Sequence, residues 1–398
     1  MVGHWIRSIF RKAKPVAPEA NSSSPMHTVD GTRKPAPAAT TPIPIAASEN
    51  PWGVQLLDVR PFTQTMLSTS VDPRCATNAV SFGQDDGQGF VGEIPQSDLR
   101  LAIDLRYPVD HRIADGVLFI PRQMEHKWAL FVHQGTIICV RSWTRQVQAI
   151  AHFTVQDGYA QIYELHGTLL PDHADARTNQ RLLDFLLRSH ALQLPYPVPL
   201  PVGLELSPDA AAIWCMAQFG KLALFATAEE VLYELPDKPL RTHSLLHIAV
   251  ARGDIDAVRS RLKAGDPVDL LAADGLTPIQ WALASRNPQV LSILKDAGAD
   301  IDARSSEGAT ALMTAAQGSN AEAFDFILAH GADPNARDLR GFTALHRAAE
   351  MGKIDFVKKL LDQGADISLA ANGHTARSFA MARNEAQVVA LLDEFANR

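Results

Sequence analysis

The clearest hydrophobic pattern in the chain is a repeat that recurs every 32 or 33 residues in its carboxy-terminal part. Each copy opens with a hydroxyl residue, and these are Ser244, Thr277, Thr310, Thr343 and Thr375. Apolar residues follow at the spacing of two short helices, and in the first four copies a glycine stands after the second. A hydroxyl side chain can cap a helix, and glycine can end one in the left-handed conformation. Because no copy can bury its own apolar face, we expect five copies to stack into a solenoid.

This register resembles the ankyrin repeat over residues 240–398, with the last copy as a cap. The resemblance implies an all-α solenoid that binds a protein partner with its hairpin tips and inner helices. The partner-binding positions that it implies are Asp274, Leu276, Ser306, Glu307, Gln317, Leu339, Arg340, Phe342, Glu350 and Met351. We expect Leu339, Phe342 and Met351 to be exposed apolar anchors, with the alternative that Phe342 packs on the neighbouring hairpin.

His247 and His346 occupy one position of the repeat and are predicted to be structural rather than catalytic or metal-binding. Their position matches the ankyrin histidine that ties adjacent loops together. Arg377 stands where the other copies have leucine or isoleucine. A polar residue there suits a terminal unit whose outer face meets water.

Residues 52–239 show strand-like apolar runs instead of a repeat. Five runs rich in β-branched and aromatic residues predict strands, at 117–120, 128–133, 136–143, 147–155 and 159–165. Asp157-Gly158 is a hairpin signal, and short connections favour an antiparallel meander. Helices are predicted over 177–192, from Ser207 onwards and from Thr227 to Leu235, with an extended linker over 195–201. The prediction is an α+β module with helices on one face of its sheet.

The string Lys127-Trp128 … Arg141-Ser-Trp-Thr144 is similar to a KW…RSWT motif of small uncharacterised bacterial proteins. That motif lies on adjacent strands, often with glycine after the threonine, and the resemblance implies no known activity. Here Arg145 takes the glycine's place. Arg141, between Trp128 and Trp143, suits either bidentate binding of an anion or a structural cation–π contact.

Further polar residues of the middle region could belong to a site. His126, His133, His152 and His166 could line a sheet face. Asp172, His173 and Asp175 could bind a divalent metal, or form a solvated loop before a helix. Because no phosphate-binding loop, HExxH motif or nucleophile elbow is present, we predict no cofactor, metal or catalytic residue.

The first 51 residues predict a basic, disordered leader rich in proline and alanine. Its first fourteen residues combine Trp5, Ile6, Ile9 and Phe10 with four basic side chains. They could form a short helix on an anionic membrane, or a terminus without a role. The predicted division is therefore 1–51, 52–239 and 240–398.

Composition narrows the choice of function further. The net charge of −7 argues against nucleic acid, and no apolar run is long enough to span a membrane. Three scattered cysteines indicate a reducing compartment, so we expect a cytoplasmic protein. We also expect a monomer. The sequence predicts a non-catalytic adaptor or scaffold. The alternatives are an enzyme whose site lies in 52–239 and whose repeats recruit substrate, and a membrane-surface scaffold held by residues 1–14.

Overall fold

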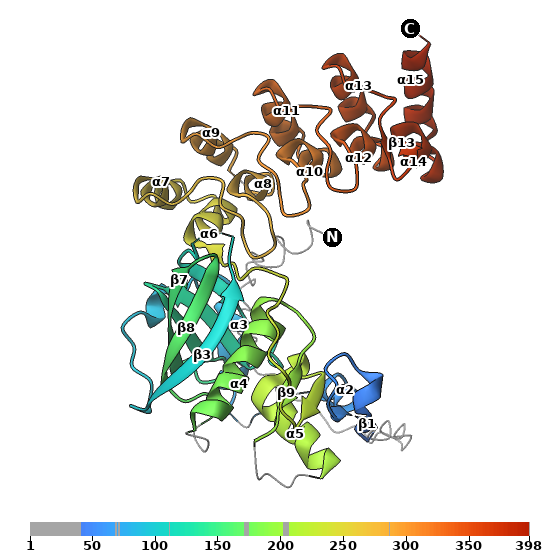
Figure 1. The fold of residues 1–398 in the computed structure, drawn as a ribbon. Coiled ribbons are helices and arrows are strands. Elements are labelled where there is room, and N and C mark those ends of the chain that lie inside the picture. Colours follow the sequence, from blue (N-terminus) through green and yellow to red (C-terminus); the bar gives the residue numbers. More distant parts are fainter. Residues whose placement is uncertain are drawn as a thin grey trace, which may run out of the picture.

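The computed structural model describes residues 41–67, 70, 72–110, 112–170, 175–201, 207–285 and 287–397. In these ranges a mixed α and β region is followed by a row of paired helices (Figure 1). Residues 1–14, which were interpreted either as a short helix on a membrane or as a terminus without a role, lie outside the described residues. Within the described ranges, no helix has both the length and the apolar character needed to cross a bilayer.

The larger sheet has seven antiparallel strands in the order β11-β4-β5-β6-β7-β8-β3. Its strands are β3 (Arg100–Pro108), β4 (Gly116–Phe119), β5 (Trp128–His133), β6 (Thr136–Arg141), β7 (Gln146–Gln156), β8 (Tyr159–Gly167) and β11 (His243–Ser244). The predicted five-strand meander, β4 to β8, is confirmed. At the β7–β8 turn, Asp157 and Gly158 have φ angles of 52° and 78°, which a tight hairpin of this type requires.

Both faces of this sheet are covered, so the expectation of helices on one face is wrong. One face packs on α4 (Ala176–Leu186), its π-helical extension (Leu187–Ala191) and α5 (Pro208–Phe219). The other face packs on short helical segments, which are η2 (Phe82–Gln84) and η3 (Gln88–Phe90), and these follow α3 (Arg74–Ser81). The physical reason is that every residue of β5 is buried, so neither side of this strand can face water.

A second, four-stranded sheet corrects three predictions. Its order is β1 (Ile43–Ile45), β2 (Leu56–Asp58), β10 (Phe225–Thr227) and β9 (Pro197–Pro199). The leader predicted to be disordered to residue 51 therefore contains a paired strand, followed by η1 (Ala47–Glu49). The proline-rich segment 195–201 contains a strand, β9, at the edge of the sheet, where the missing N–H groups of proline cost least.

The helix predicted from Thr227 to Leu235 is absent, because Thr227 ends β10 instead. The Thr227 hydroxyl donates to the carbonyl of Gln55 at 2.8 Å and accepts from the N–H of Glu229 at 3.1 Å. The predicted helices in 177–192 and from Ser207 are confirmed as α4 and α5. Two short helices complete this region, α2 (Arg60–Thr63) and η5 (Gly220–Leu222).

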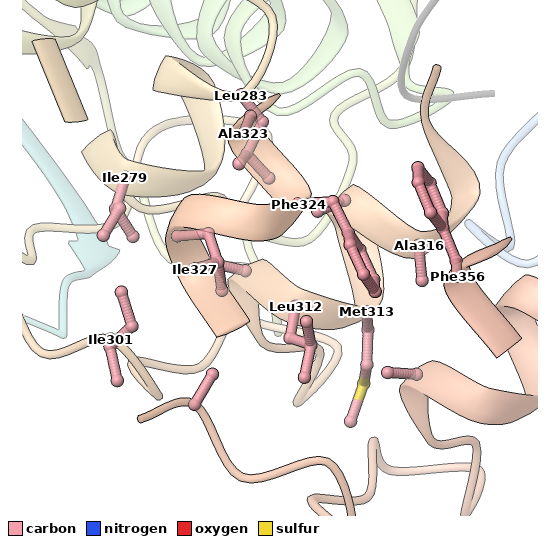
Figure 2. Close-up of a cluster of buried hydrophobic side chains, with 14 of the residues drawn as sticks. Ile279, Leu283, Ile301, Leu312, Met313, Ala316, Ala323, Phe324, Ile327 and Phe356 are labelled. Atoms are coloured by element: carbon pink, nitrogen blue, oxygen red, sulfur yellow. The ribbon is translucent and has the colours of Figure 1, made fainter. Parts of the chain in front are cut away.

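Five helix pairs follow, as predicted, and form two rows in Figure 1. We number them units 1 to 5, with the bounds α6 (Leu245–Arg252) and α7 (Ile255–Lys263), α8 (Pro278–Ala282) and α9 (Gln289–Asp296), α10 (Ala311–Gln317) and α11 (Ala321–Ala329), α12 (Ala344–Glu350) and α13 (Ile354–Asp362), α14 (Ala376–Ala382) and α15 (Ala386–Ala396). A short hairpin, β12 (Ala370–Ala371) and β13 (His374–Thr375), precedes unit 5. Figure 2 shows the core between units, where the rings of Phe324 and Phe356 are stacked. Their centroids are 4.1 Å apart.

Unit 1 also belongs to the core of the larger sheet. Its strand β11 pairs with Val117 and Gly116 of β4, and Leu245 and Ile248 pack in one cluster with Phe82 and Phe131. The repeats are therefore continuous with the sheet through shared hydrogen bonds and a shared apolar cluster.

The connector between β10 and β11 is held by a buried ion pair. Arg188 donates to the carboxylate of Asp184 at 2.8 Å, and both side chains are more than nine-tenths buried. Arg188 also donates to the carbonyl of Glu234, and Tyr107 donates to Asp184. The arginine thus fixes the connector on the surface of α4.

Candidate functional site

In units 1, 2 and 4, a polar side chain at the same position of the inner helix contacts the next unit. His247 Nδ1 lies 2.7 Å from the Ser244 hydroxyl, and its Nε2 lies 3.2 Å from the carbonyl oxygen of Leu276 in the next unit. His346 bridges Thr343 and the carbonyl of His374 in the same way. Burial lowers the pKa of His247 to about 4, so this histidine is neutral at pH 7. The structural role predicted for both histidines is confirmed.

Gln280 occupies the histidine position of unit 2 and makes equivalent hydrogen bonds to its own helix start and to the next unit. Its amide donates to the carbonyl of Ala309 at 2.9 Å, while its oxygen accepts from the N–H of Thr277. The contact therefore depends on a donor that reaches the next hairpin rather than on imidazole chemistry.

A second tie recurs on the outer loops. Asp269, Asp302 and Asn335 stand 33 residues apart, and each accepts a hydrogen bond from the backbone N–H of the residue 31 positions ahead. Only the Asn335 side chain of these three also donates, to the carbonyl of Gly364 at 3.0 Å. Burial raises the pKa of Asp269 and of Asp302, because desolvation disfavours the charged carboxylate.

The hairpin tips form a continuous edge along the array. The N–H of Ser306 donates to the carbonyl of Gly275, and that of Leu339 donates to the carbonyl of Glu307. At the unit 4 tip, Leu339 is 79% exposed, and Met351, at the end of α12, is 49% exposed. Arg340 and Gln317 are also exposed, whereas Glu350 is half-buried and forms an ion pair with Arg383 at 2.7 Å.

Two of the predicted partner-binding residues are buried. The expectation that Phe342 is exposed is wrong, because its ring packs 5.1 Å from that of Phe379 and 4.1 Å from the Arg347 guanidinium. The alternative was packing on the neighbouring hairpin, and in the structure the ring packs on helix α14 of that neighbouring unit. Leu276 is also buried, and its backbone carbonyl is occupied by His247.

The first tips lie beside the mixed α and β region, and Asp274, Ser306 and Glu307 are also exposed to solvent. Asp274, Leu276, Ser306 and Glu307 line a cavity of about 260 Å³. Its opposite wall carries Leu118, Ala191, Gln193 and Lys238. The predicted surface is therefore divided: its first part borders this cavity, and its second part, with Leu339 and Met351, remains open.

The recurring helix pairs, ties and tips were compared with known proteins. A scan against protein families matches the description "Ankyrin repeats (3 copies)" to residues 246–338, 299–371 and 331–397. Residues 246–397 are ankyrin repeats. A search of curated proteins finds no significant match to the chain. The ankyrin repeats commonly mediate protein binding, and the match covers the open second part of the predicted surface.

Outside the ankyrin repeats, Arg141 anchors a helix. It does not lie between two indoles. The Arg141 guanidinium carbon lies 4.9 Å from the ring centroid of Trp128, whereas the ring of Trp143 is covered by Lys127, whose Nζ lies 3.6 Å from the centroid. Arg141 donates to the carbonyls of Gln218 at 2.7 Å and Ala217 at 3.3 Å, at the end of α5. These contacts agree with the structural cation–π interpretation of Arg141.

Of the KW…RSWT residues, Trp128 begins β5 and Arg141 ends the adjacent strand β6, where the two are paired. Lys127 precedes β5, and residues 142–144 form the turn after β6. Arg145, which replaces the motif's glycine, has a left-handed φ of 56°. Its guanidinium donates to Ser81 and Asp85 and covers Phe82 at 4.3 Å. These contacts offset the cost of a left-handed conformation in a residue with a Cβ atom.

The other candidate residues of this region are dispersed. His133 Nε2 lies 2.8 Å from the carbonyl oxygen of Asp86, whereas His152 lies 3.9 Å from Glu164. Asp175 caps α4 by accepting from the N–H of Thr178 at 2.7 Å. Asp172 and His173 lie outside the described residues. In the part of the chain that the structure describes, no three His, Cys, Asp or Glu side chains are grouped as metal ligands.

The sequence did not indicate a cavity of about 290 Å³ at the junction of the sheet and the ankyrin repeats. We call it the junction cavity. Its apolar walls are Val117, Leu118, Phe119, Ile120, Leu194, Pro195, Leu222, Leu224, Ile248 and Trp281, and its polar residues include Asp85, Arg122, His126, Ser189, Gln193, His243 and Arg252. These residues come from segments far apart in the chain, so no local motif marks them. The one available signal was the apolar run 117–120, which was interpreted only as a strand.

Proposed function

We propose that the ankyrin repeats bind a partner protein along the open edge of units 3 and 4, with Leu339 and Met351 as apolar anchors. The observation that carries this proposal is the exposure of these two large side chains on an array whose other apolar residues are mostly packed between helices. Exposed apolar groups beside an arginine, here Arg340, are typical of binding hot spots.

In this proposal the protein is an adaptor or scaffold. Gln317 and Glu350 form the polar rim of the surface, and the tips of the earlier units, with Asp274, Ser306 and Glu307, extend it toward the sheet. Cys75, Cys139 and Cys215 are free thiols, which supports a cytoplasmic setting.

The test is a paired-variant binding measurement. The partner is first captured from the native host with the intact protein, identified by mass spectrometry and purified. We expect the double variant Leu339→Ser, Met351→Ser to bind the purified partner at least about tenfold more weakly, because hot-spot side chains contribute about 2 kcal/mol or more each.

Two exposed apolar residues elsewhere provide matched controls. Met381 is 54% exposed on the terminal unit and Leu232 is 82% exposed on the connector. Met381→Ser and Leu232→Ser should bind like the unmodified protein, and all variants should keep the same circular-dichroism melt. Unchanged affinity of the double variant would place the interface elsewhere.

A further inference from the structure

The junction cavity has the size and lining of a small-molecule site. Its volume of about 290 Å³ is near the lower end of the range for ligand pockets. A water molecule occupies about 30 Å³ and a methylene group is of similar size, so a body of about ten heavy atoms fits inside, and a head group can extend to the rim, where Arg122 is exposed. Walls of leucine, isoleucine, phenylalanine and tryptophan favour an apolar body.

The charges around the junction cavity favour an anion. Among the described residues that line it, only Asp85 is acidic, and its carboxylate is 2.9 Å from Arg145. Arg252 donates to the carbonyl of Gln84 and lies 3.7 Å from Asp86. Arg122 adds a further positive charge at the wall.

Besides burial, the positive charge of Arg122 helps to lower the pKa of two histidines, His126 and His243, that also line the cavity. Burial is the main cause that lowers the pKa of His126, to about 4, and the positive charge of Arg122 adds to this effect. Burial, His247 and then Arg122 lower the pKa of His243 in the same direction. Both imidazoles are therefore neutral at pH 7, and the charge presented to a ligand there is that of the arginine.

We propose that the junction cavity binds a small amphipathic monocarboxylate, with its linear apolar body along β4 and Trp281 and its carboxylate beside Arg122. An arginine holds a carboxylate by charge-assisted hydrogen bonds. The neighbouring 260 Å³ cavity has two carboxylates, Asp274 and Glu307, against one cation, Lys238, so its charge is less favourable for the same group. The ligand contacts both the sheet and units 1 and 2, so its binding stabilises their junction.

The test uses decanoate and 1-decanol as probes of the intact protein in isothermal titration calorimetry. We expect saturable binding of decanoate that is tighter than that of decanol. Arg122→Gln should weaken decanoate binding by about tenfold or more and leave decanol binding unchanged, because only the charge-assisted contact is lost. Arg100→Gln, which removes an exposed arginine of β3, is the matched control and should bind both probes normally.

The place of binding is tested separately. Ile120→Trp fills the cavity and should abolish binding of both probes. A decanoate brominated at the end of its chain should quench the fluorescence of Trp281, and this quenching should be absent in Trp281→Phe. Equal decanoate affinity of the protein and Arg122→Gln, or absence of saturable binding to the intact protein, would overturn the proposal. Tight binding that survives Ile120→Trp in a folded variant would do so as well.

Discussion

Single side chains decide how well consecutive ankyrin units are joined. Asp269, Asp302 and Asn335 occupy one position, yet only the asparagine both accepts and donates across the loop. Oδ1 of Asp269 is buried without a hydrogen-bond partner among the described residues. A neutral amide avoids the desolvation cost of the carboxylate and adds a donor.

We therefore predict that Asp269→Asn stabilises the protein. The new amide can donate to the carbonyl of Gly298, because Gly298 follows residue 269 at the same spacing at which Gly364 follows Asn335. The gain in free energy of unfolding should be about 0.5–1 kcal/mol at pH 7. Because the pKa of Asp269 is raised in the folded state, its carboxylate costs stability as the pH rises through that pKa, and this cost is absent below the unfolded pKa.

The gain should consequently be larger at pH 7 than at about pH 3, which urea unfolding at the two pH values measures. Asp98→Asn, an exposed aspartate of the other region, is the control and should change neither value. An equal gain at both pH values would show that charge is not the cause.

At the scale of elements, local signals predicted what local interactions determine. The repeat pattern predicted the ten helices of units 1 to 5, and Asp157-Gly158 predicted the β7–β8 hairpin. Strands β3 and β11 were missed because their pairing partners lie far away in sequence. The helix predicted from Thr227 to Leu235 is absent because a hydroxyl that accepts a nearby N–H can end a strand as well as begin a helix. The exposure of Leu339 followed from the repeat, whereas the burial of Phe342 depended on Phe379 in the next unit.

The Asp184–Arg188 pair joins α4, β3 and the connector, and its loss should destabilise all three. We predict that Asp184→Ala lowers the free energy of unfolding by about 3–5 kcal/mol, because it leaves Arg188 buried without its carboxylate. Asp393→Ala, which removes the exposed partner of Arg377, should have little effect. Thermal melts followed by near-ultraviolet circular dichroism compare the two variants. Similar melts would show that the buried pair is dispensable.

At the scale of the whole molecule, unit 1 is shared between two folds. Its helix α6 packs on unit 2 through Leu246 and Ala249 and on the sheet through Leu245 and Ile248. Residues 240–398 alone should therefore give a helical spectrum but expose the face of α6 that the sheet normally covers.

We predict that amide hydrogens of α6 exchange faster in this fragment than in the intact protein, whereas those of α10 and α12 exchange at similar rates. Hydrogen exchange followed by mass spectrometry measures both. Unchanged protection of α6 would mean that the sheet contributes nothing to unit 1. A β-rich spectrum of the fragment would contradict the repeat architecture itself.

Strand β11 has a consequence for engineering the chain. Because two residues of the first repeat complete the edge of a seven-stranded sheet, a graft that exchanges the array for a different one has to retain His243 through Arg252. A cut placed at the sequence boundary near residue 240 would remove strand β11 from the sheet and would uncover the face of α6 that packs on that sheet.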